Sequence, residues 1–166
     1  PYRIDESGSP ARIGYEDFLK LRHSNIESLN EAYGKKFTNW EELSAKPRLN
    51  FDIETESARA DENAFLALIA DRHFTILREA VKAGAPNHLY LGERTQLRTI
   101  PDSVLAVMGK YIDVFCTQSL IRLPKSPPEW QVFQREYYDH EYSLVGKPMV
   151  IIDWAAPFTL QDEAVK

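Results

Sequence analysis

A short apolar run near the end of the chain stops at a carboxylate and an indole. Residues 147–154 read KPMVIIDW, so Asp153 and Trp154 directly follow a strand-like segment. A carboxylate can act as a nucleophile or as a general acid and base. An indole presents a large flat surface and one hydrogen-bond donor, which suits stacking on a pyranose ring, although core packing of Trp154 is equally compatible with the sequence. This pair of residues points toward sugar chemistry.

Two earlier apolar runs also stop at polar side chains. Glu93 and Arg94 follow residues 88–92, and Gln118 follows residues 111–117. In barrel enzymes the carboxyl ends of parallel strands present the catalytic groups. We therefore expect Glu93, Arg94 and Gln118 to reach the same face as the acid at the end of the third run. A structural ion pair between Glu93 and Arg94 remains an alternative to sugar binding.

Helical patterns separate these three runs. Apolar spacing predicts a long helix over residues 60–83, and Gly84 and Pro86 follow it. Residues 101–110 predict a second helix, and a third begins after Ser126 and ends at Gly146. Helices that alternate with short apolar strands are typical of an α/β fold with parallel strands buried on both faces. A doubly wound sheet and part of a β/α barrel both fit this order.

The first third of the chain is different. Residues 1–14 are rich in glycine, proline, serine and charge, and predict a loop. Apolar spacing predicts one helix over residues 15–33, ended by Gly34, and capping-box spacing predicts a short helical turn over residues 38–43. We expect residues 1–59 to be mostly helical and loop, ahead of the β/α units.

Composition excludes several classes of function. The formal net charge is −5, which disfavours a nucleic-acid partner. No apolar run approaches the length of a membrane span. The single cysteine, Cys116, rules out an internal disulfide and is predicted to be a core residue. No cofactor is expected, because no strand leads into a glycine-rich phosphate loop and the four histidines have no metal-ligand spacing. The chain begins at Pro1, which indicates a processed, trimmed or partial sequence.

Four segments resemble one group of enzymes. Residues 30–34 and 37–43 look like the LNxAWGTxFxSWxEL segment of bacterial β-galactosidases and β-agarases. Residues 86–94 read PNHLYLGER and resemble the PNHLYLGxR strand of the agarases. Residues 111–118 are similar to the next strand, YxDVxSxNxY, and residues 147–154 to the KPxxIxEF strand that carries the nucleophile. The order of the segments matches the large clan of retaining glycosidases.

This resemblance implies a fold and a reaction. The fold is part of a (β/α)8 (TIM) barrel that contains strands five to seven, within a single domain or fragment over residues 1–166. Residues 1–59 form a mostly helical and loop insertion, and residues 60–166 form β/α units. The implied activity is hydrolysis of a galactose-containing oligo- or polysaccharide. A non-catalytic carbohydrate-binding relative and an inactive truncated fragment are the alternatives. If the chain is complete, its two open strand edges favour a homo-oligomer.

The resemblance also assigns site residues. Asp153 occupies the nucleophile position, where the family has glutamate, and Gln118 stands where the family has asparagine. Glu93, Arg94, Gln118 and Trp154 are implied substrate contacts. The family's general acid/base belongs to an Asn-Glu pair after strand four, and no such pair follows a predicted strand here.

Two further predictions concern helix surfaces. His73 lies on the apolar face of the long helix and is predicted to be a satisfied core histidine. Residues 137–141, with two tyrosines and charged neighbours, are predicted to form an exposed helix surface.

Overall fold

The computed structural model describes residues 8–46, 55–96, 100–118 and 127–152, with side chains for all of these except residues 96, 118 and 127–134. Two compact units divide the chain, Pro1–Leu66 and Ala67–Lys166. The predicted N-cap Ser126 lies outside the described residues.

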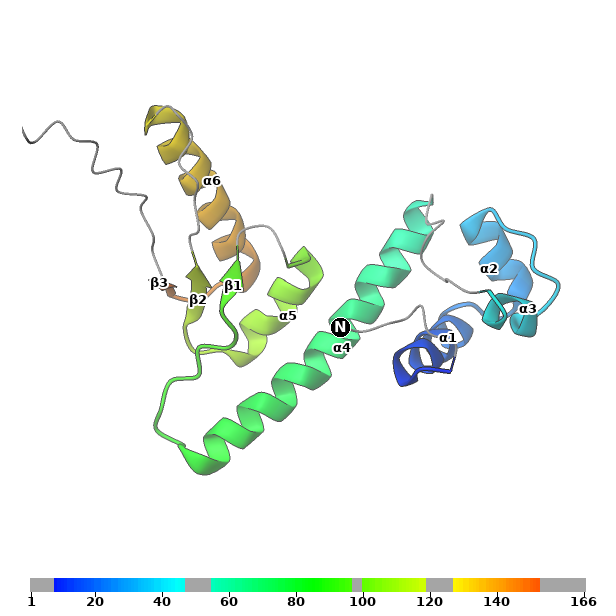
Figure 1. Cartoon of the computed structure of the whole chain (residues 1–166), viewed down its shortest axis with the longest axis horizontal. Coiled ribbons are helices and arrows are strands. Elements are labelled where there is room, and N and C mark those ends of the chain that lie inside the picture. The colour runs from blue at the N-terminus through cyan, green and yellow to red at the C-terminus, as the bar shows by residue number, and fades with distance from the viewer. Residues whose placement is uncertain (1–7, 47–54, 97–99, 119–126, 153–166) are drawn as a thin grey trace, which may run out of the picture. The chain divides into compact units, whose positions relative to one another are not determined.

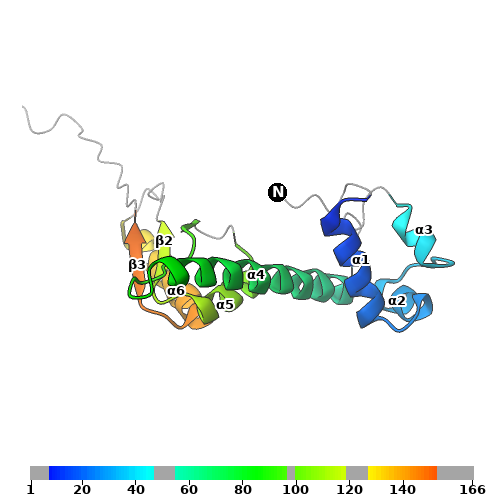
Figure 2. The same cartoon turned by 90° about the horizontal axis from the view of Figure 1, so that it is seen from below.

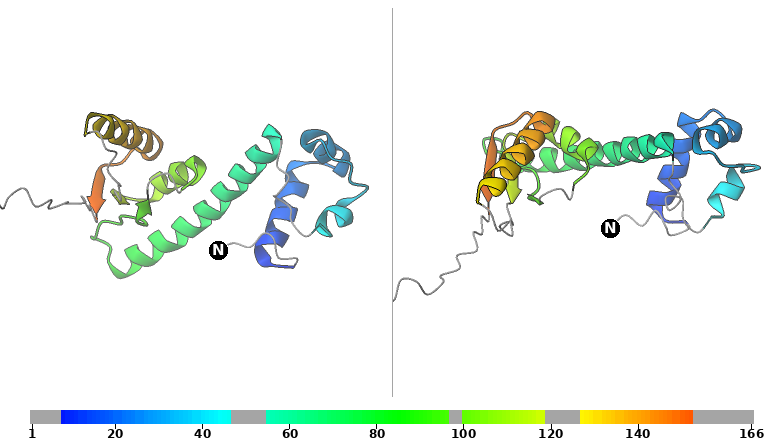
Figure 3. Two further views of the ribbon diagram at one scale, coloured as in Figure 1. Left: turned by 45° about the horizontal axis from the view of Figure 1, so that its top comes forward. Right: turned by 90° about the horizontal axis from the view of Figure 1, so that it is seen from above.

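The first unit is built from short capped helices (Figure 3). Helix α1 spans Pro10–Arg22, because Ser9 Oγ accepts the backbone N–H of Arg12 and proline occupies the first turn. The prediction of a loop through residue 14 is therefore wrong for its last five positions. The chain leaves helical geometry at His23, and Asn25 caps a second helix, α2 (Ile26–Tyr33).

The predicted single helix over residues 15–33 is thus wrong, because Asn25 accepts the N–H of Ser28 and starts a new helix. Gly34 ends α2 as predicted, in left-handed geometry with φ 63°. Helix α3 (Trp40–Ser44) begins two residues after the start of the predicted turn. Its cap is Asn39, and Glu42 reaches back to the N–H of Thr38.

Helix α4 (Glu56–Gly84) confirms the long helix and extends it by one turn at its amino end (Figure 2). Thr55 Oγ1 accepts the N–H of Ala58 at this end. The carboxyl-terminal part of α4 belongs to the second unit, where Ala70 and Phe74 are buried in the core.

The second unit contains a parallel sheet in the order β1-β2-β3 (Figure 1). The strands are β1 (Thr95–Gln96), β2 (Phe115–Gln118) and β3 (Met149–Ile152). Helix α5 (Asp102–Tyr111) connects the first two strands, and α6 (Pro127–Val145) connects the last two. Both strand pairs are parallel, which confirms the α/β prediction.

One predicted strand is misplaced. Residues 88–92 were expected to be extended in the sheet, but the first strand lies at 95–96. The backbone of Tyr90 is bound elsewhere: its N–H donates to the Asp113 carboxylate and its carbonyl accepts the N–H of Asp113. Gly92 follows with φ 73°, a geometry that interrupts a strand.

The core of the second unit is built from helices that precede β2 in the sequence and from one that follows it. Phe115 is fully buried among residues of α4, α5 and α6, including Phe74, Met108 and Val145. Cys116 is buried as predicted. The prediction that strands are buried on both faces is wrong for β3, where Val150 and Ile151 are 36% and 41% exposed because β3 is an edge of the described sheet.

Candidate functional site

The carboxyl edge of the sheet ends in one row of three residues. Gln96 is in register with Gln118, and Gln118 is in register with Ile152. The strand direction places this row at the end where α/β enzymes bind ligands. The next residue after Ile152 is Asp153, which lies, with Trp154, outside the described residues. Of this row, the sequence analysis selected Gln118 alone as a candidate site residue.

The paired residues one position earlier in β1 and β2 have a different environment. Thr95 and Thr117 are paired in register and are 1% and 0% exposed. The Thr95 hydroxyl donates to the carbonyl of Cys116. Because side chains alternate along a strand, Thr117 shares a face with Phe115, which packs among the helices.

Glu93 and Arg94 lie before β1 and not after a strand. Glu93 Oε1 is 2.6 Å from Nε2 of His73 on α4. The two side chains are 54% and 38% exposed, respectively, so His73 is not the core residue that its helix face predicted. Arg94 is also exposed. The pairing of Glu93 joins residues twenty positions apart, and no local pattern in the sequence indicates it.

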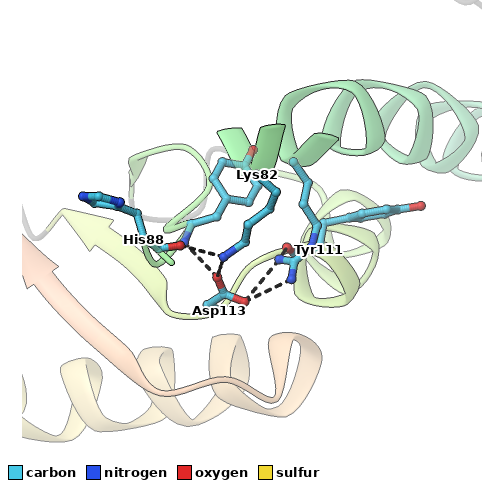
Figure 4. Close-up of polar contacts among 6 residues, drawn as sticks. Lys82, His88, Tyr111 and Asp113 are labelled. Atoms are coloured by element: carbon cyan, nitrogen blue, oxygen red, sulfur yellow. Dashed lines mark hydrogen bonds and ion pairs between the residues drawn. The ribbon is translucent and has the colours of Figure 1, made fainter. Parts of the chain in front are cut away.

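A charged cluster fixes the opposite, amino-terminal end of β2 (Figure 4). Asp113 accepts the N–H of Tyr90 at 2.9 Å, Lys82 Nζ at 3.0 Å and the guanidinium of Arg78 at 3.2 Å. Lys82 also donates to the carbonyl of His88, and Arg78 donates to the carbonyl of Tyr111. This cluster ties α4, the segment before β1 and the end of α5 together.

The same contacts explain the electrostatics of Asp113. The hydrogen bond from the Tyr90 backbone, followed by those of Lys82 and Arg78, holds the pKa of Asp113 well below its usual range. An ionised carboxylate is therefore maintained there. Because α/β enzymes bind ligands at the other, carboxyl end of the strands, we assign this cluster a structural role.

A second carboxylate is buried on α6. Glu141 on α6 is 2% exposed, and its Oε1 accepts the hydroxyl of Tyr137, which is 4% exposed. Among the described residues, Oε2 of Glu141 has no hydrogen-bond partner. Burial raises the pKa of Glu141, opposed by the hydrogen bond from Tyr137. The prediction of an exposed surface over residues 137–141 is wrong at these two positions.

The first unit has its own buried acid. The Asp61 side chain is 3% exposed and pairs with Arg22 and with Nε2 of His23, the latter at 2.7 Å. Its Oδ2 also accepts the Tyr33 hydroxyl at 2.9 Å. Three helices meet at this carboxylate, and no residue expected at the site is among its partners.

Within the described part of the chain, no group of three or more histidine, cysteine, aspartate or glutamate residues is arranged to hold a metal ion. None of the helices described here has the length and apolarity needed to cross a membrane.

Comparison with known proteins identifies agarases as relatives. No protein-family model matches the chain. The chain is similar to β-agarase B of Vibrio sp. (strain JT0107), with 27% identity over 113 residues, which is 66% of this chain and 11% of that protein. It is also similar to β-agarase A of the same strain, with 33% identity over 92 residues, 54% of this chain and 9% of that protein.

Solved structures agree in fold. An exo-β-agarase matches 88% of this chain and 18% of its own, with 31% identity and a TM-score of 0.65. PfGH50B and the agarase AgWH50C each have 22% identity, with TM-scores of 0.64 and 0.63, and they match 87% and 86% of this chain. The chain thus has the α/β fold of one segment of agarase structures, and it spans about a tenth of the length of the curated relatives it matches.

Proposed function

We propose that this chain is part of a glycoside hydrolase that acts on an agarose-type galactan. The observation that carries the proposal is the likeness to an exo-β-agarase over 88% of the chain at 31% identity. The parallel order β1-β2-β3, with a helix between successive strands, supports the same reading. In this proposal the three strands are strands five to seven of a (β/α)8 barrel, residues 60–166 are its β/α units, and residues 1–59 are a helical and loop insertion.

The proposed reaction places Asp153 at the nucleophile position. In the sequence it follows β3 directly. Retaining hydrolysis needs two carboxyl groups about 5 Å apart, one to attack the anomeric carbon and one to protonate the leaving oxygen. The acid partner in this proposal is supplied from outside strands five to seven.

Aspartate at this position has a chemical consequence. Its side chain is shorter than glutamate by one bond of about 1.5 Å. A displacement of this size can cost about a hundredfold in rate unless the backbone moves to compensate. This departure favours a second candidate function, a non-catalytic carbohydrate-binding relative, in which Trp154 stacks on the sugar and Gln118 binds its hydroxyl groups.

Glu93 and Arg94 are proposed substrate contacts with a different geometry. Both lie in the segment that leads into β1, and Glu93 is positioned by His73. A carboxylate held by an imidazole keeps a second oxygen that can accept a sugar hydroxyl. The alternative to an agarase specificity is a β-galactosidase specificity for simple galactosides. Comparing hydrolysis of agarose with hydrolysis of an aryl β-galactoside distinguishes the two.

The test measures release of reducing sugar from agarose and from an aryl β-galactoside. We expect release from agarose by the complete enzyme of which this chain is part, and its loss in Asp153→Ala. The matched control is Asp139→Ala, an exposed aspartate on α6, which should retain the wild-type rate. Binding of agarose oligosaccharides without turnover would establish the non-catalytic relative. Absence of both turnover and binding would refute the proposed function.

A further inference from the structure

A buried acid on α6 meets the central strand of the sheet. Oε1 of Glu141 accepts the hydroxyl of Tyr137, which is one turn earlier on the same helix. Burial raises the pKa of Glu141, and the nearby hydroxyl groups of Tyr137 and of the fully buried Thr117 on β2 oppose this shift. Among the described residues, neither Oγ1 of Thr117 nor Oε2 of Glu141 has a partner in regular hydrogen-bonding geometry. The Thr117 hydroxyl is therefore a close polar neighbour of the carboxyl group, at a distance or angle outside that of a full hydrogen bond.

Thr117 lies one residue before the carboxyl edge of the sheet. It is in register with Thr95 on β1 and with Ile151 on β3, because β2 is the middle strand of the three. In the sequence Gln118 follows Thr117 directly, and Asp153 comes two residues after Ile151. A shift of the Thr117 backbone is therefore passed through the strand ladder to both neighbouring strands, close to where they end.

A carboxyl group at this buried position is costly. Taking it out of water is unfavourable, and an apolar side chain of similar size on the same helix face would avoid that cost. Positions that break a packing rule in this way are typical of functional sites. Since Tyr137 binds one oxygen of Glu141, the carboxyl group is held in one orientation against β2.

We propose that Glu141 is a positioning residue for glycoside hydrolysis, which holds the carboxyl end of β2 in place through Thr117; this inference rests on the proposed function. Glu141 acts through the strand and not by contact with the substrate. The end of β2 leads to Gln118, a proposed substrate contact, and pairs with the strand that leads to the proposed nucleophile Asp153. A displacement of about 1 Å at the reacting atoms can cost about a hundredfold in rate, so a small movement of β2 is sufficient to slow the reaction.

The experiment measures kcat and KM for hydrolysis of an agarose hexasaccharide by the complete enzyme of which this chain is part. Glu141→Leu keeps the apolar bulk of the side chain and removes its polar atoms, whereas Glu141→Gln keeps its shape and an oxygen for the Tyr137 hydroxyl. Thr117→Val removes the hydroxyl on the other side of the contact. The matched control is Glu136→Leu, at an exposed position on α6. Rates are measured well below the lowest melting temperature and are expressed per folded molecule, as determined by circular dichroism.

We expect Glu141→Leu and Thr117→Val each to lower kcat about tenfold with KM nearly unchanged, because a misplaced strand end weakens contacts made in the transition state. The double variant should lose little more than either single variant, since both changes remove the same contact. Glu141→Gln should recover most of the rate, and Glu136→Leu should match wild type.

Three results would overturn the inference or the function beneath it. If Glu141→Leu changes the melting temperature but not kcat per folded molecule, Glu141 serves stability alone, and the proposed function stands without this inference. If the losses of the two single variants multiply in the double variant, Glu141 does not act through Thr117. If the wild-type complete enzyme does not hydrolyse the hexasaccharide, the proposed function fails and this inference fails with it.

Discussion

The ammonium of Lys82 lies 3.0 Å from Oδ2 of Asp113, which joins the last turn of α4 to the residues that lead into β2. Asp113 also accepts the N–H of Tyr90, and its own N–H donates to the Tyr90 carbonyl. The Asp113 carboxylate therefore accepts the Tyr90 N–H, which in a strand would bond to a neighbouring strand, and β1 begins only at Thr95.

Replacement of Asp113 by asparagine should lower the melting temperature at pH 7. The amide cannot pair with Lys82 and Arg78, and both cations lose their counter-charge. The pKa of Asp113 in the folded chain is depressed below its unfolded value of about 3.9. Its contribution to stability is therefore complete above that value and is lost as the pH falls through the folded pKa.

Thermal melts of wild type and Asp113→Asn between pH 7 and pH 2.5 measure this effect. We expect the difference in melting temperature to be constant from pH 7 to about pH 5 and to shrink at lower pH. The control is Asp139→Asn, whose partner Arg135 is exposed and 3.7 Å away, and which should differ little from wild type. An equal difference at pH 7 and pH 2.5 would contradict the ionic origin.

Helices α5 and α6 approach closely at Gly109. An alanine Cβ there would lie 2.5 Å from the carbonyl oxygen of Val145 and 3.0 Å from its Cα. Alanine normally stabilises a helix relative to glycine by about 0.8–1 kcal/mol. Here the neighbour is backbone and cannot yield, so we expect Gly109→Ala to destabilise the chain by about 1–3 kcal/mol, the range found for overpacked cores.

Urea unfolding of Gly109→Ala and Gly84→Ala tests this close approach. A Cβ at Gly84, also within a helix, would meet nothing within 4 Å. Gly84→Ala should therefore be neutral or slightly stabilising. If the two variants have the same unfolding midpoint, the contact between α5 and α6 is not as close as described.

Much of this fold could be predicted from local chemistry. The apolar spacing of residues 60–83 and the stop signals Gly34 and Gly146 predicted helices and ends that the structure confirms. Short apolar runs between helices predicted parallel strands, and β2 and β3 are parallel in register. These signals act over a few residues, which is why a single sequence contains them.

Several of the failures involve partners that are distant in sequence. Residues 88–92 have the apolar composition of a strand, but Asp113, more than twenty residues away, takes up the Tyr90 N–H. His73 has a helix position typical of a core residue, yet it pairs with Glu93. The backbone register of Gln96 with Gln118 also has no motif in the sequence. Such pairings depend on the packed fold and not on local propensity.

Glu93 pairs with His73 in the structure and is a proposed contact with substrate, and the two can be tested separately. Both side chains are more than a third exposed, so the pair should contribute at most about 1 kcal/mol to stability. We expect His73→Ala and Glu93→Ala to melt within a few degrees of wild type, while only Glu93→Ala removes the proposed acceptor for a sugar hydroxyl.

Isothermal titration calorimetry with an agarose hexasaccharide separates the pairing from the proposed contact. Glu93→Ala should weaken binding by about tenfold, as expected for a hydrogen bond to a charged group, and His73→Ala should weaken it less. Equal losses in the two variants would indicate that the orientation of Glu93 by His73 is what matters. Unchanged affinity in Glu93→Ala would remove this residue from the site and leave the His73 pair as its role.

Glu141 should make the chain less stable as the pH rises. The burial of this carboxyl group raises its folded pKa above the unfolded value of about 4.3. Its favourable contribution is therefore complete below the unfolded pKa and is lost as the pH rises through the folded pKa. Glu141→Gln keeps an oxygen for the Tyr137 hydroxyl and removes the ionisation. We expect the melting temperature of Glu141→Gln relative to wild type to be higher at pH 8 than at pH 4. Glu136→Gln, an exposed change on the same helix, should show a difference that does not depend on pH. A relative melting temperature of Glu141→Gln that stays constant from pH 4 to pH 8 would mean that Glu141 finds a cationic partner or solvent in the folded chain.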